Sequence, residues 1–192
     1  MNELNDISKF RKVKPMEDEK TKRILDAAQD LILAQGLRAT TMEAIARSAG
    51  VAKPTLYGRF PDKTSVFRAA VLRLLDSMRK RFSAEMQGPG RAKDRIAGAL
   101  AVKFAMVNDI LARSPHAAQL MEDNIAHAGA EFADLNAWVI GEVARALAED
   151  GHPDPENRAM LLHACLDGLK SHAATEPDLA AKVRFVTSRL LD

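Results

Sequence analysis

The sequence predicts an all-α fold of about nine helices, with a three-helix N-terminal head and a larger helical body. Two observations lead to this prediction. Apolar residues recur at helical spacing in almost every segment, and no segment shows the convincing alternation of a strand. Glycine and proline interrupt the apolar runs at Gly36, at Gly50, in "QGPGR" and in "EDGHPDP". With 192 residues, 47% of them apolar, the chain is long enough to bury a substantial core.

The first two helices of the head are predicted by apolar spacing and by their end signals. From Glu17 to Gln35 the apolar residues follow one helical face, and Gly36 is the expected stop. The next helix lies in "TTMEAIARSAG", where Thr40 and Glu43 have the spacing of a capping box, and it ends at Gly50.

A third short helix is expected from Lys53 to Phe60, because Pro54 is tolerated in a first turn, where its missing N–H has no partner to lose. Asp62 is the expected cap of a fourth helix. Its apolar stripe is Phe67, Val71, Leu74, Met78 and Phe82.

Five further helices are expected in the body. One carries Ile96 to Leu111, and Ser114 followed by Pro115 has the pattern of a cap and a first-turn proline. The next two are expected at His116 to Ala126 and around Phe132, Leu135, Val139 and Val143. After Asp154 and Pro155 comes a helix from Asn157 to Ala174, then "TEPD", and a last helix with Leu179, Val183, Val186 and Leu190.

The small net charge of +2 conceals an asymmetry between the two halves of the chain. Residues 1–95 hold 20 basic and 12 acidic side chains, whereas residues 96–192 hold 8 basic and 14 acidic. A basic first half suggests contact with a polyanion, and scattered solvated charge is the alternative. The single cysteine, Cys165, fits a reducing compartment, and no signal peptide or apolar run of membrane-spanning length is found, so we expect a soluble, cytoplasmic protein.

The segment "AGVAKPTLYGRF", from Ala49 to Phe60, has the pattern of a helix-turn-helix. Gly50 allows the left-handed turn, and Val51 fills the angle between the two helices. Leu56 and Phe60 would face the core of the head. In this orientation the residues that point away from the core of the head, or flank the helix, are Lys53, Thr55, Tyr57, Gly58 and Arg59. These residue types suit base edges and phosphates, although a helix-turn-helix that is only a structural corner is the alternative.

The longer run "TTMEAIARSAGVAKPTLYGRFPDKTSVF", Thr40 to Phe67, resembles the DNA-binding head of the tetracycline-repressor (TetR) family. The resemblance implies a DNA-binding transcriptional regulator, as a repressor released from a palindromic operator by a small molecule or, alternatively, as an activator. It also implies that Thr41 contacts a phosphate, that Lys53, Pro54 and Thr55 approach base edges, and that Tyr57 and Lys63 bind the backbone. Ala52 and Gly58 depart from the family's usual residues, so the operator sequence cannot be transferred from relatives.

We expect three segments: a basic arm at residues 1–15, a DNA-binding head at 16–62 and a body for effector binding and dimerisation at 63–192. The arm holds "KFRKVK", which could follow the DNA backbone or enter the minor groove, or could be a solvated tail.

Two copies of so small a head are needed to specify an operator, so we expect a homodimer. The helix from Asn157 to Ala174 is apolar almost all round, and the resemblance implies that the last two helices pair with their copies. The candidate interface is Leu162, Leu166, Leu169, Val183, Val186 and Leu190. A helix buried wholly inside one subunit is the alternative.

A small-molecule pocket in the body is also implied by the resemblance. Its candidate lining mixes aromatic and polar side chains: Met78, Phe82, Phe104, Val107, Asn108, Met121, Trp138 and His163. We expect no enzyme activity, no cofactor and no metal site, because no nucleophile with its base and no metal-ligand spacing is found. A helical adaptor that binds only protein would leave the basic recognition helix unexplained.

Overall fold

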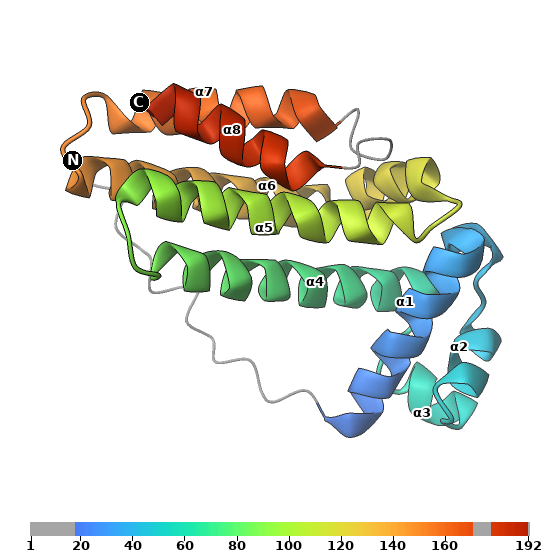
Figure 1. Cartoon of the computed structure of the whole chain (residues 1–192). Coiled ribbons are helices and arrows are strands. Elements are labelled where there is room, and N and C mark those ends of the chain that lie inside the picture. Colours follow the sequence, from blue (N-terminus) through green and yellow to red (C-terminus); the bar gives the residue numbers. More distant parts are fainter. Residues whose placement is uncertain (1–17, 171–177, 192) are drawn as a thin grey trace.

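The computed structural model describes residues 18–170 and 178–191, and within these ranges the chain forms eight helices and no strand (Figure 1). The prediction of an all-α fold is confirmed. The helices are α1 (Glu19–Ala39), α2 (Met42–Ser48), α3 (Lys53–Tyr57), α4 (Lys63–Met86), α5 (Ala92–Ala112), α6 (Ala117–Glu149), α7 (Pro155–Lys170) and α8 (Leu179–Leu191).

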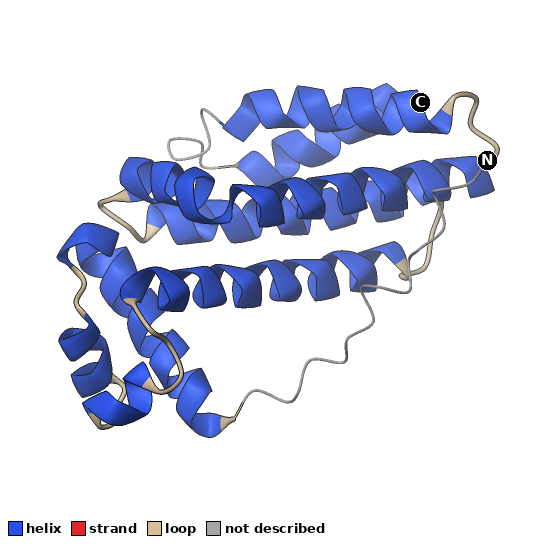
Figure 2. Cartoon of the chain, turned by 180° about the vertical axis from the view of Figure 1, so that it is seen from behind, coloured by secondary structure: helices blue, strands red, loops and turns tan. Residues whose placement is uncertain are grey.

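Helices α1 to α3 form a small group at one end of the molecule, and α4 runs from this group along the body (Figure 1). The body is stacked in layers: α4 lies beneath α5 and α6, and α7 and α8 lie above them. Helix α8 packs along α5, and α7 packs along α6. The view from behind shows the same order (Figure 2). Helix α4 therefore carries the chain from the head into the body.

The two helices expected between His116 and Val143 are one element, α6, with a break at Ala128. Ala128 has φ −145° and ψ 22°, outside the helical range. The sequence around the break contains alanines and no proline, so the helix resumes at once instead of ending. This is the reason that eight helices are found where nine were expected.

The cap of α2 is Thr41 and not Thr40. The Thr41 hydroxyl accepts a hydrogen bond from the Ala44 amide at 3.1 Å. Thr40 is fully buried, and its hydroxyl donates to the Gly36 carbonyl at 2.8 Å. Gly36 breaks the helical geometry with φ +79°, as predicted, although α1 continues to Ala39. Two adjacent threonines thus serve the end of one helix and the start of the next.

Helix α3 is shorter than predicted, because it ends at Tyr57 and Gly58 is its C-cap. Ala52 precedes it and gives no side-chain cap, as its methyl group dictates. The predicted cap of α4 is confirmed: the Asp62 carboxylate accepts from the Ser65 amide at 2.7 Å, and the two residues form a capping box.

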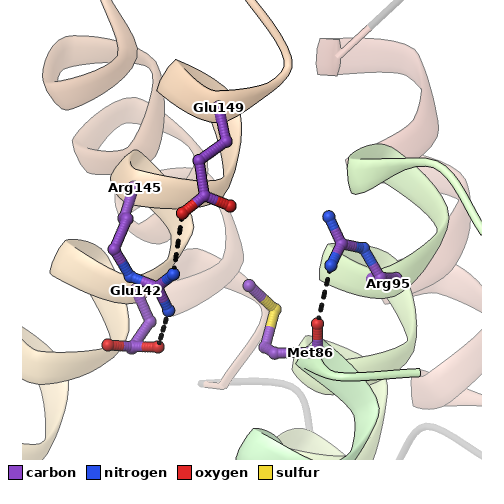
Figure 3. Close-up of polar contacts among 5 residues, drawn as sticks. All are labelled: Met86, Arg95, Glu142, Arg145 and Glu149. Atoms are coloured by element: carbon purple, nitrogen blue, oxygen red, sulfur yellow. Dashed lines mark hydrogen bonds and ion pairs between the residues drawn. The ribbon is translucent and has the colours of Figure 1, made fainter. Parts of the chain in front are cut away.

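The core runs continuously from the head into the body. Ile24, Ile45 and Leu56 are fully buried in the head, and Phe82 and Leu100 are buried in the body. The Arg95 guanidinium, near the start of α5, donates to the carbonyl of Met86, the last residue of α4, at 3.0 Å and so joins the two helices (Figure 3).

None of the helices in the described ranges is long and apolar enough to cross a membrane.

Candidate nucleic-acid interface

The corner between α2 and α3 is built around Gly50. Its φ of +62° is a left-handed conformation that glycine adopts at little cost. Ala49 before it is buried, and the Val51 amide after it donates to the Ala46 carbonyl at 3.0 Å. Val51 packs against the core, as expected. These contacts hold α3 at an angle to α2.

Helix α3 is anchored by one side chain. Leu56 is fully buried, whereas Lys53, Pro54 and Tyr57 are exposed, and Thr55 is half-buried. Tyr57 is a large aromatic residue with 46% of its surface exposed. The head therefore presents one face of α3 to solvent, and it is the face that the sequence predicted.

The Lys53 ammonium lies 3.3 Å from the Glu43 carboxylate on α2, and both side chains are more than half exposed. A hydrogen bond from its own backbone amide, and then the ammonium of Lys53, hold the pKa of Glu43 below its ordinary value. Exposed ion pairs of this kind contribute little to stability. Lys53 can therefore leave Glu43 for a nucleic acid at small cost.

Arg59 has partners inside the protein. Its Nη1 donates to Asp18 Oδ2 at 2.6 Å and to the Thr21 hydroxyl at 2.7 Å. Asp18 is the N-cap of α1 and also accepts from the Thr21 amide at 2.7 Å. The Thr21 amide and then the Arg59 guanidinium lower the pKa of Asp18 to about 2. In this structure Arg59, two residues after the end of α3, is joined to the start of α1.

Lys63 also binds atoms of the protein itself. Its ammonium donates to the carbonyls of Leu37, Arg38 and Thr40 at 3.0, 3.1 and 3.3 Å. These carbonyls lie at and just after the end of α1, where helical backbone acceptors lack intrahelical donors. Lys63 thus fastens the start of α4 to the end of α1.

The predicted DNA-contacting residues are brought together on one end of the molecule, by α2, α3 and the start of α4. Thr41, Lys53, Pro54, Tyr57 and Gly58 are exposed there, and Arg59 and Lys63 bind neighbouring elements. Sequence reasoning missed Asp18, and it gave Glu43 a capping role and not its contact with Lys53. Asp18 could have been predicted as the N-cap of α1, because an aspartate just before a helix can accept a hydrogen bond from the backbone amide three residues later, here that of Thr21.

The predicted lining of a body pocket is partly brought together. The rings of Phe82 and Trp138 meet edge to face with centroids 5.4 Å apart, and the Arg79 guanidinium lies over Trp138. Met78, Phe82 and Phe104 are buried core residues, while Val107 and Asn108 are half-buried. His163 lies 3.7 Å from Asp167 on α7. The side chain of Met121 lies outside the described residues.

An apolar cleft lies elsewhere, where α1, α4, α5 and α6 meet. Its walls include Ile32 and Leu33 of α1, Phe67 and Val71 of α4, Leu111 of α5 and Leu120 of α6. None of the predicted pocket residues whose side chains are described belongs to this lining. Across the described ranges, no group of three His, Cys, Asp or Glu side chains could hold a metal ion.

Part of the predicted dimer interface is buried within the single chain. Leu162, Leu166 and Val183 are buried within the single chain, with at most 1% of each exposed, because α7 turns this stripe toward α6 and α8 turns Val183 inward. Val186 is half-buried, Leu190 is exposed, and the Leu169 side chain lies outside the described residues. Among the described residues of α7 and α8, the exposed large apolar side chains are Met160, Leu161, Phe185 and Leu190, and Cys165 is exposed as well.

Comparison with known proteins finds a family match for the head. Residues 24–70 match the family model described as bacterial regulatory proteins, tetR family. The HTH-type transcriptional regulator BetI of Rhizobium meliloti is 33% identical over 89 residues, which are 46% of this chain and 44% of that protein. The chain thus spans less than half the length of this curated relative.

Solved structures share the fold over nearly the whole chain. A transcriptional regulator from Cytophaga hutchinsonii superposes with a TM-score of 0.74 at 21% identity, covering 91% of this chain and 97% of that one. The fatty acid degradation regulator FadR from Bacillus halodurans gives 0.68 at 20% identity, covering 92% and 96%. At these identities the likeness shows a common fold, including the body that the family model does not cover.

Proposed function

We propose, from the match of residues 24–70 to the family of bacterial regulatory proteins, tetR family, that the whole chain is a homodimeric DNA-binding transcriptional regulator. We propose that it is a repressor, that it binds a near-palindromic operator and that a small molecule releases it. The head at 16–62 binds DNA, and the body at 63–192 dimerises and holds the effector. No catalytic role is proposed.

The observation that carries this proposal is the orientation of α3. Leu56 alone is fully buried on this helix, whereas Lys53, Pro54 and Tyr57 are exposed, as is Thr41 just before α2. Lysine can donate to a guanine edge, and the hydroxyl groups of Thr41 and Tyr57 can donate to phosphates. A protein-binding adaptor would not require this combination of basic and hydroxyl groups on one short helix.

The dimer is supported by the outer face of α7 and α8. Met160 and Leu161 are 54% and 55% exposed on α7, and Phe185 is 62% exposed on α8. Several large apolar side chains exposed on two neighbouring helices are typical of an interaction surface. We propose that this face, and not the buried Leu166 stripe, meets a second copy of the chain.

Selection of bound duplexes from a random library tests the DNA-binding proposal. We expect a near-palindromic site whose half-sites lie about one helical turn, or a multiple of it, apart. A selection that yields only random or asymmetric sequences would refute a dimeric operator-binding protein. A reporter with the selected site placed at a promoter then separates repression from activation.

A further inference from the structure

We propose that Glu43 and Lys53 read one base pair of the operator together: Lys53 donates to a guanine, and Glu43 accepts from the cytosine paired with it. Glu43 lies in the first turn of α2, and Lys53 is the first residue of α3. The proposal rests on the proposed DNA-binding function. It adds a second residue that selects the base pair and the type of base pair that is selected.

The Glu43 carboxylate lies where the Lys53 side chain ends. Lys53 Nζ donates to Glu43 Oε1 at 3.3 Å, although the two residues are ten positions apart in the chain. The backbone of both is fixed, because the Thr41 hydroxyl caps α2 and the fully buried Leu56 anchors α3. An ammonium has three N–H donors, so Lys53 can bind Glu43 and a base edge at once. A base edge that Lys53 reaches in this way also lies beside the carboxylate.

A contribution to the fold does not explain this ion pair. The Lys53 and Glu43 side chains are 61% and 52% exposed, and ion pairs between exposed side chains contribute little to stability. Arg59 and Lys63, by contrast, bind side chains or carbonyls of the neighbouring α1 segment. Among the charged groups at this end of the head, Lys53 and Glu43 are therefore a pair that remains open to a ligand.

A carboxylate on the face that meets DNA has an electrostatic cost. The DNA backbone is a polyanion, so an exposed glutamate two residues after Thr41 lowers the affinity for every duplex. Hydrogen-bond donors offset this cost, and the base donors of the major groove are the amino groups of cytosine and adenine. Glu43 thus disfavours phosphates and base acceptors and favours these two amino groups.

The combined pattern of Lys53 and Glu43 fits G·C better than A·T. Guanine presents two neighbouring acceptors, N7 and O6, and the cytosine paired with it presents an N4 amino donor next to them. The ammonium suits the two acceptors, and the carboxylate beside it suits the amino group. In an A·T pair the amino donor lies between two acceptors, adenine N7 and thymine O4, so a carboxylate there would also lie beside an acceptor.

Binding of the full chain to operator duplexes that carry each of the four base pairs at one position tests the proposal. This position is the one where Lys53→Ala relaxes the base preference. We expect wild type to prefer G·C there by about tenfold and Glu43→Ala to lose the preference. Glu43→Ala should bind random DNA at least as tightly as wild type, because a negative charge is removed. A purely structural role of Glu43 would instead lower both affinities.

Asp30→Ala, at an exposed position of α1 in the same head, is the matched control and should keep the preference. The proposal is overturned if Lys53→Ala relaxes no position, if wild type prefers another base pair at that position, or if Glu43→Ala keeps the preference or binds operator and random DNA equally weakly. In those cases wild type still selects an operator, and the proposed function stands. If wild type selects no sequence, the proposed function fails and this inference fails with it.

Discussion

The Arg59 guanidinium lies 2.6 Å from the Asp18 carboxylate, so that the second residue after α3 is joined to the cap of α1 across 41 residues of sequence. The same nitrogen also reaches the Thr21 hydroxyl. An arginine that was expected to contact DNA is thereby assigned a second role, which is to position the end of α3.

Asp18→Ala tests this positioning role. Removing a negative charge near DNA should strengthen binding by electrostatics alone. We expect the opposite, a several-fold loss of operator affinity, because Arg59 loses the partner that orients the end of α3. Fluorescence anisotropy with a labelled operator measures it, and Asp76→Ala, an exposed aspartate on α4, is the control. Tighter operator binding by Asp18→Ala would contradict the role.

The pH dependence of the start of α1 follows from the lowered pKa of Asp18. The Thr21 amide and the Arg59 guanidinium favour the ionised carboxylate, so its pKa falls from 3.8 to about 2 on folding. A lowered carboxyl pKa contributes stability that is present above pH 4 and is lost as the pH falls toward about 2. We expect the Thr21 amide resonance to titrate with a midpoint near 2, and a midpoint near 4 would contradict the contact.

Lys53→Ala is expected to relax base preference at one operator position. If Lys53 donates to a base edge, its loss should cost about 1–3 kcal/mol on the selected operator and much less on random DNA. Lys80→Ala, an exposed lysine far along α4, is the matched control. Equal losses on specific and random duplexes would mean that Lys53 contacts the backbone and not a base.

Lys63→Met separates the structural role of this lysine from a phosphate contact. Three carbonyls lose a charged donor, so we expect the free energy of unfolding to fall by about 1–2 kcal/mol in thermal or urea denaturation. If the ammonium also reaches a phosphate, all duplexes should bind more weakly and the salt slope should fall by about one unit. Lower stability with an unchanged slope would contradict the phosphate contact.

Leu161→Glu and Leu166→Glu make the same change on two faces of α7. Leu161 is 55% exposed and Leu166 is 1% exposed. We expect Leu161→Glu to give folded monomers, because the charge enters the proposed interface, and Leu166→Glu to lose the fold, because it buries an unpaired charge. Light scattering and circular dichroism distinguish the outcomes. A folded Leu161→Glu dimer would place the interface elsewhere.

Much of the fold was predictable from local patterns. The period of apolar residues predicts helices because a helix must bury one face, and it located α4 with its buried Phe67, Val71, Met78 and Phe82. Gly36 and Gly50 were correct as break points because both have positive φ. The burial of Leu56 and the outward side of α3 followed from the same spacing.

Other features depend on contacts that no local pattern contains. Helix α7 is apolar on most sides, so periodicity could not tell that Leu166 faces inward and Leu161 outward; the position of α6 beneath it decides this. The Lys63 ammonium meets carbonyls 23 to 26 residues earlier in the chain, and Arg59 meets Asp18, because α4 and α3 fold back against the two ends of α1. Sequence spacing determines which residues share a helical face, whereas the packing of helices determines which face is covered and which charges meet.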